Sequence, residues 1–168
     1  ERAVVTSGAT AGSQAYAQRR LVLNNTSVLD FNRMHEFEFP LHVTALTANG
    51  NIWLRWGHSA YASPSQRAFG FKITGAGALW SEVYDTALKT QDQGMTLSLN
   101  TLYLLRALWV PGLGAQFWVN GVEKTAIAST DVGTQTDNNK GYFAVANGVD
   151  AAAISFELNG IRIRQAYS

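Results

Sequence analysis

The chain has 168 residues, of which 46% are hydrophobic and 15% are charged, so it is long enough to bury a core as one domain. Lys and Arg number 13 against 12 Asp and Glu, and the formal net charge of +1 excludes the strongly basic surface that nucleic acid binding needs. No cysteine is present, which excludes disulfides and thiolate metal sites, and no apolar run approaches the roughly 20 residues that would insert across a membrane.

The first 19 residues are rich in Ala, Ser, Gly and Gln, and most of them lack a sustained hydrophobic period. We expect Ala3 to Thr6 to form a short leading strand, and residues 1–19 as a whole to be an N-terminal arm or linker. A single domain is then predicted over residues 20–168.

From Arg20 onward, apolar and polar residues alternate with a period close to two, which is typical of half-buried strands. Phe37 and Phe39 are predicted to point into the core. Glu36 and Glu38 then lie on the opposite face of the same strand. The same alternation predicts further inward-facing residues: Ile52, Leu54, Trp56, Phe69, Phe71, Ile73, Leu79, Val83, Ile154, Phe156, Leu158, Ile161 and Ile163.

Turn residues divide these strands. Pro40 is expected to end its strand or to place it at a sheet edge, because proline has no N–H to donate. Asn49-Gly50 and Asn120-Gly121 each predict a hairpin, since both residue types tolerate positive φ.

Helix is rejected for the most apolar segment, Thr101 to Val110, because Pro111 and Gly112 follow at once. Residues 86–89 are expected to form one turn of helix at most, and residues 95–99 to form a strand. About a dozen short strands without a longer helix predict an all-β protein, a two-sheet antiparallel β-sandwich.

Two segments carry a family resemblance. Tyr103 to Trp109, followed by Gln116-Phe-Trp-Val-Asn-Gly121, resembles a hairpin of the concanavalin A-like lectin/glucanase superfamily, in particular of its laminin-G-like members. Ile154 to Ile163 resembles the closing strand of that fold. The resemblance implies a concanavalin A-like jelly roll, often with a carbohydrate or protein ligand on its concave face or edge loops. It also implies a place among extracellular adhesins, polysaccharide-active enzymes or bacteriophage tail and capsid appendages.

The outward positions of the strands gather aromatic and ionic side chains. Aromatic rings offer a flat apolar surface to the C–H faces of sugars, while carboxylates and guanidinium groups bind hydroxyls. The predicted ligand-binding residues are Trp53, Arg55, Trp80, Glu82, Tyr84, Arg106 and Trp118. In the alternative interpretations, this surface packs against a neighbouring subunit, or several of its tryptophans belong to the core.

No catalytic residue is predicted. Glucanases of the superfamily carry alternating acids on one strand, and here only Glu36 and Glu38 come near that pattern, with Pro40 at the third position. The three histidines, His35, His42 and His58, lack metal-ligand spacing. Loop oxygens that calcium prefers are offered by Asp131, Asp137, Asn138, Asn139 and Asp150, but the spacing of a calcium loop is missing, so no metal or other cofactor is predicted.

The sequence therefore predicts a non-catalytic binding or assembly domain that is extracellular or on a virion surface. It is a tail-fibre, capsid-decoration or cell-surface module that recognises carbohydrate or neighbouring protein subunits, as a homo-oligomer or part of a larger assembly. The alternative is a polysaccharide hydrolase or lyase of the same fold.

Overall fold

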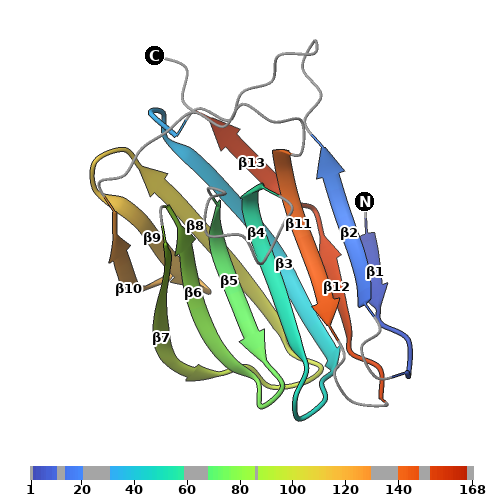
Figure 1. The fold of residues 1–168 in the computed structure, drawn as a ribbon. Helices are drawn as coiled ribbons and strands as arrows, with labels where there is room; N and C mark the ends of the chain where they lie inside the picture. Colours follow the sequence, from blue (N-terminus) through green and yellow to red (C-terminus); the bar gives the residue numbers. More distant parts are fainter. Residues whose placement is uncertain are drawn as a thin grey trace.

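The computed structural model describes residues 2–10, 14–20, 31–58, 68–85, 87–129, 140–147 and 152–165. These residues form two antiparallel sheets that face each other, so the predicted all-β sandwich is confirmed (Figure 1). The described residues include no helix that could span a membrane.

The first sheet has seven strands, and the second has six. In spatial order the seven-stranded sheet contains β1 (Arg2–Thr6), β12 (Ser155–Asn159), β3 (His35–Ala45), β8 (Leu102–Val110), β9 (Gly114–Val119) and β10 (Val122–Ala128), with β13 (Arg162–Gln165) also paired to β3. The six-stranded sheet contains β2 (Gln14–Arg20), β11 (Lys140–Asn147), β4 (Asn51–His58), β5 (Ala68–Thr74), β6 (Ala78–Tyr84) and β7 (Leu88–Thr96).

Alternate residues of the strands fill the space between the sheets. Phe37 and Phe39 are 1% and 2% exposed, and their rings stack with centroids 5.5 Å apart. Most of the other predicted inward residues are also buried: Ile52, Leu54, Trp56, Phe69, Phe71, Ile73, Leu79, Val83, Ile154, Phe156 and Leu158. Ile161 and Ile163 are only partly buried and pack against the same core. Burying each large side chain of this kind stabilises the fold by about 1.5–3 kcal/mol. The burial of these side chains is therefore the main interaction that holds the two sheets together.

The two Asn-Gly turns behave differently. Asn120 and Gly121 have φ values of 51° and 79°, and they join β9 to β10 in the predicted hairpin. Asn49 and Gly50 lie between β3 and β4, which belong to different sheets, so the hairpin predicted there is wrong. That turn closes with a 3.0 Å hydrogen bond from the Gly50 N–H to the Thr47 carbonyl and carries the chain from one sheet to the other.

Pro40 lies inside the central strand β3, which corrects the prediction of a strand end or a sheet edge. On one side β3 pairs continuously with β8, and on the other side Pro40 lies opposite the break between β12 and β13. The Val43 carbonyl accepts a hydrogen bond from the Asn100 N–H beside β8. Because successive strand residues direct their backbone groups to opposite neighbours, Pro40 directs its nitrogen to the break, where a missing N–H removes no ladder bond.

The N-terminal segment belongs to the sandwich. The strand predicted at residues 3–6 is present as β1, which pairs with β12. The residues expected to continue as an arm or linker instead include β2, which pairs with β11 in the opposite sheet. The described part of residues 1–19 therefore adds one edge strand to each sheet.

The strand predicted at residues 95–99 is the polar edge strand β7, and it lies earlier in the sequence than predicted. It begins at Leu88, where at most a helical turn was expected, and it ends at Thr96 rather than at Leu99. Its burial is weak along most of its length, so the hydrophobic alternation that marks other strands is faint here.

Gln93 connects β7 to the other sheet by hydrogen bonds. Its side-chain amide donates to the Thr125 carbonyl at 3.0 Å and accepts from the Thr125 N–H at 2.9 Å, which imitates backbone pairing across the sandwich edge. The same amide donates to the Ser81 hydroxyl at 2.9 Å. Thr125 lies where the β9–β10 register shifts, so the bulge directs its backbone towards Gln93.

Candidate functional site

The predicted site residues fall on two outer faces of the sandwich. Five of them lie on the six-stranded sheet: Trp53, Arg55, Trp80, Glu82 and Tyr84. Arg106 and Trp118 lie on β8 and β9 of the seven-stranded sheet. The structure therefore brings together the first group and separates it from the second by the thickness of the core.

A buried ionic cluster forms the centre of the first group. Arg55 on β4 donates from Nε to Oε2 of Glu82 on β6 at 3.2 Å, and its Nη2 contacts the same oxygen. The same Nη2 donates to the Tyr84 hydroxyl at 2.8 Å, and the guanidinium lies 4.4 Å from the Tyr84 ring centroid. Arg55 and Glu82 are 3% and 2% exposed, so both charges are neutralised inside the cluster rather than offered to solvent.

Gly70 makes this contact between β4 and β6 feasible. In the sheet register Arg55 pairs with Gly70 on the intervening strand β5, and Gly70 pairs with Glu82. A Cβ at Gly70 would lie 2.0 Å from the Leu54 carbonyl oxygen and 2.8 Å from the Arg55 Cα. With no side chain at this position, the Arg55 side chain lies over β5 and reaches the carboxylate beyond it.

Burial raises the pKa of the Tyr84 hydroxyl above its ordinary value of 10.0. The positive charge of Arg55 opposes this rise, and the negative charge of Glu82 adds to it. Tyr84 is therefore a neutral phenol at physiological pH, suited to hydrogen bonding and poorly suited to removing a proton.

Next to the cluster lies an aromatic row, defined here as Trp53, Lys72 and Trp80. These residues are cross-strand neighbours on β4, β5 and β6, and each is half-buried. The Lys72 Nζ and the Arg55 Cζ both lie 5.8 Å from the Trp53 ring centroid, so two cations hold that indole in place. The two tryptophans are separated by one strand, which puts their backbones about 10 Å apart.

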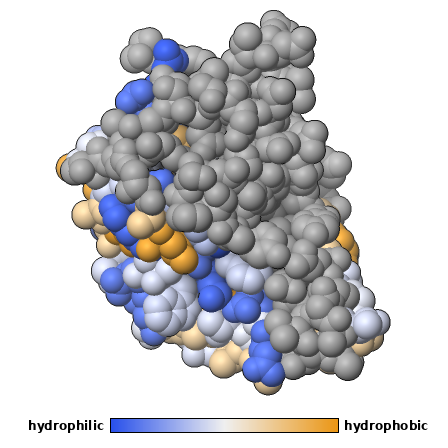
Figure 2. Space-filling view, viewed as in Figure 1, coloured by the Kyte–Doolittle hydropathy of each residue, from blue (hydrophilic) through white to orange (hydrophobic). Residues whose placement is uncertain are grey.

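This face is turned to the viewer in Figure 1, where β4 to β7 lie in front of the other sheet. Figure 2 shows that the described part of the same view is mostly hydrophilic or intermediate in hydropathy, with a smaller hydrophobic area to one side. A surface of this kind suits an amphipathic ligand more than a purely apolar one.

The outer face of the seven-stranded sheet carries its own charge network. Arg106 donates from Nε to Glu36 at 2.7 Å, and its guanidinium lies 4.4 Å from the Trp118 ring centroid. Arg164 approaches the other Glu36 oxygen at 3.6 Å, and Arg162 lies 3.3 Å from Glu38. Both glutamates are thus paired with arginines and do not form an acid pair.

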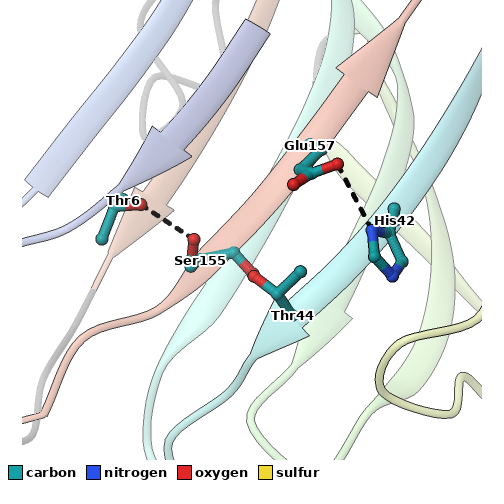
Figure 3. A network of polar contacts seen from close by, with 5 residues as sticks. All are labelled: Thr6, His42, Thr44, Ser155 and Glu157. Carbon is teal, nitrogen blue, oxygen red and sulfur yellow. Dashed lines mark hydrogen bonds and ion pairs between the residues drawn. The ribbon is translucent and has the colours of Figure 1, made fainter. Parts of the chain in front are cut away.

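A second polar network on that face joins β1, β12 and β3 (Figure 3). The Thr6 and Ser155 hydroxyls are 2.8 Å apart, and the Thr44 hydroxyl donates to the Ser155 carbonyl at 3.1 Å. His42 Nδ1 lies 3.4 Å from Glu157 Oε2. These contacts are exposed or partly buried and connect neighbouring strands, so we assign them to the pairing of β1 and β12 with β3.

The remaining candidates for chemistry are only partly described. Asp131, Asp137, Asn138, Asn139 and Asp150, considered above as calcium ligands, lie outside the described residues, as does the side chain of His58. In the part of the chain that is described, no three His, Asp or Glu side chains gather as a metal site.

Sequence reasoning missed the role of Gly70 and left Lys72 out of the predicted site. The alternation of Phe69, Phe71 and Ile73 places both residues on the outer face, which is the signal that locates them. Their partnership with Arg55 and Trp53 depends on strand order, which the alternation does not contain.

The sequence matches no protein-family model and no curated protein. Solved structures do resemble the fold. An alginate lyase from Alteromonas sp. 272 matches with a TM-score of 0.62 and 9% identity, covering 99% of this chain and 88% of the lyase. The carbohydrate binding module CBM66 from Bacillus subtilis matches with a TM-score of 0.57 and 8% identity, covering 92% of this chain and 83% of the module.

A third similar structure is an immunostimulatory antigen and pseudo β-1,3-glucanase of Mycobacterium tuberculosis, with a TM-score of 0.62 and 14% identity, covering 99% of this chain and 75% of the antigen. These likenesses confirm the predicted concanavalin A-like jelly roll. The fold is shared by binding modules and by enzymes, so function must be argued from the residues of the site.

Proposed function

We propose that this protein is a non-catalytic glycan-binding module whose ligand lies across the aromatic row on the outer face of the six-stranded sheet. The observation that supports this most directly is the placement of Trp53 and Trp80 as half-buried neighbours on either side of β5. Two indoles on strands about 10 Å apart offer stacking surfaces to well-separated sugars of one extended chain.

The ionic cluster supports the row from one side. Arg55 packs against Trp53 and forms an ion pair with Glu82. The guanidinium therefore orients the indole while its own positive charge is balanced by the Glu82 carboxylate. Such preorganisation lowers the entropy lost when a ligand binds.

The same cluster favours binding over catalysis. Arg55 and Glu82 are buried and bonded to each other, and the neutral Tyr84 hydroxyl accepts a hydrogen bond from Arg55. A lyase needs a base poised to remove a proton, and a hydrolase needs two acids at a defined separation. The alternative of a hydrolase or lyase therefore lacks support from the described side chains of this face.

The setting of the module is a further part of the proposal. An extracellular or virion-surface location, including a tail fibre or capsid decoration, stays a prediction. So does membership in a homo-oligomer or a larger assembly.

A second candidate, a contact with a neighbouring protein, is favoured by one observation on the opposite face. Leu102 and Leu104 on β8 are 60% and 38% exposed, and Val4 on β1 is 58% exposed. Apolar side chains at outward strand positions suit a protein interface. Light scattering after size exclusion tests this: Leu102→Glu is expected to convert a multimer to a monomer, and a wild-type monomer would contradict the contact.

The glycan proposal is tested by a glycan array followed by titration calorimetry on the best ligand. Trp53→Ala and Trp80→Ala are each expected to weaken binding about tenfold or more, which is about 1.4 kcal/mol. Trp118→Ala is the matched control, because it removes a half-buried tryptophan from the opposite outer face.

Absence of array binding by a folded protein would overturn the proposal, as would a loss of affinity only in the Trp118 variant. Release of new reducing or unsaturated ends from the bound polysaccharide would overturn its non-catalytic part.

A further inference from the structure

Lys72 stands out in the aromatic row because of what surrounds it. It lies between Trp53 and Trp80 in the register, and its ammonium group is 5.8 Å from the Trp53 ring centroid. Among the described residues no carboxylate lies within ion-pairing distance of its Nζ. An aromatic contact leaves the donors of the ammonium group available for a ligand.

The neighbouring charges do not compensate Lys72. In the adjacent row Arg55 and Glu82 neutralise each other. Asp92 is the next residue beyond Trp80 on β7, so two strand spacings, about 10 Å, separate its backbone from that of Lys72. Its carboxylate accepts from the Gly94 N–H at 2.8 Å, which holds it in its own turn.

The row therefore presents one uncompensated positive charge between two stacking surfaces. A neutral polysaccharide would use the indoles and offer the ammonium group only hydroxyl oxygens, which accept hydrogen bonds but leave its charge uncompensated. A sugar chain that carries an anion would use both, since an ammonium and a carboxylate or sulfate form a charge-assisted hydrogen bond.

We infer that the ligand of this face is an anionic polysaccharide, with Lys72 binding the carboxylate of a uronic acid or a sulfate ester while Trp53 and Trp80 stack on sugars to either side of the charged one. This inference rests on the proposed glycan-binding function and narrows it to a class of ligand. Lys72 is then the residue that sets specificity, and the tryptophans supply affinity that does not depend on charge.

The experiment compares charged and uncharged forms of one backbone. Probes are polygalacturonate with its methyl-esterified form, and dextran sulfate with dextran, each measured by affinity electrophoresis and calorimetry. The first pair tests carboxylate and the second tests sulfate. Wild type is expected to bind at least one charged form about tenfold or more tightly than its neutral partner, because a hydrogen bond to a charged group exceeds a neutral one by about that factor.

Variants separate the contribution of Lys72 from net charge. Lys72→Met is expected to lose most of the preference for the charged form, and Lys72→Arg to keep it. Arg162→Gln is the matched control, because it makes the same change in net charge on the opposite face, where Arg162 is an exposed partner of Glu38.

The outcomes distinguish the two proposals. Binding of neutral and charged forms with equal affinity, abolished by Trp53→Ala and untouched by Lys72→Met, would overturn the inference and leave glycan binding intact. An equal effect of Arg162→Gln and Lys72→Met would also overturn it, since the preference would then reflect overall charge. Failure to bind any probe or any array glycan would overturn both.

Discussion

Arg55 and Glu82 form an ion pair that is buried on the outer side of a sheet, where most charges are solvated. The desolvation of both groups is offset only while each has its partner, so the pair fixes the geometry of the face more than it adds stability. Trp53, which packs on the same guanidinium, depends on that geometry for its orientation.

Replacing one member of this pair is therefore expected to be severe. Glu82→Gln leaves the buried Arg55 charge uncompensated, and we expect the free energy of unfolding in urea to fall by about 3 kcal/mol or more. The double variant Arg55→Met with Glu82→Leu is expected to recover much of that loss, because no buried charge remains. Equal stability of the single variant and wild type would contradict this account.

Tyr84 predicts a loss of stability at high pH. Its pKa is raised on folding, so above 10.0 the unfolded chain releases this proton more readily than the folded chain does. The contribution of Tyr84 is complete below the ordinary pKa of 10.0 and is lost as pH rises through the higher folded value. Urea midpoints measured from neutral pH upwards are expected to fall more steeply above pH 10.0 in wild type than in Tyr84→Phe.

Single strands differ in how closely their sequence matches their place in the fold. β5 is easily predicted from the sequence, because its Phe and Ile residues alternate with polar or small residues. The ion pair on its outer face nevertheless requires a residue without a side chain, Gly70. β7 is polar and hard to recognise, and its attachment relies on Gln93 bonding to the Thr125 backbone of the other sheet.

The close approach at β5 is tested by Gly70→Ala. The added methyl would overlap the backbone of β4, so we expect a loss of about 3 kcal/mol or more in the free energy of unfolding. Gly160→Ala is the control: a Cβ there meets nothing within 4 Å, and its φ of 55° carries a cost of only about 1 kcal/mol. Similar losses in the two variants would show that steric overlap at Gly70 is unimportant.

In the whole molecule, strands from the two ends of the sequence pair with each other at one edge of the sandwich. β1 and β2 are consecutive in the chain but belong to opposite sheets, where they pair with β12 and β11. Figure 1 shows both at the same margin of the molecule, opposite the margin formed by β7 and β10.

Deleting residues 1–20 is therefore expected to harm the fold, whereas removal of a true linker would not. The deletion exposes the backbone edges of β11 and β12, and unpaired edges promote association between chains. We expect a lower thermal midpoint and aggregates in light scattering. An unchanged midpoint and a monomeric truncated protein would contradict the structural role of β1 and β2.

The amino-acid sequence alone predicts the fold class, most of the strands and about half of the buried apolar residues. Each of these depends on the alternation of side chains along one strand, which is a local property. Phe37 and Phe39 lie on the same face because they are two residues apart, and that face is the inner one because both are apolar. The hairpin at Asn120-Gly121 is also predicted locally, because these two residue types tolerate the positive φ values that the turn requires.

Which outward residues meet depends on the pairing of strands that are far apart in the sequence. Trp53 and Trp118 have the same pattern in the sequence, yet they lie on opposite faces of the sandwich because β4 and β9 belong to different sheets. The order of strands follows from non-local pairing, and the crossing at Asn49-Gly50 changes sheet without any signal in its own residues. Pro40 is tolerated in a central strand for a reason of the same kind, since the break it faces lies more than 100 residues away in the chain.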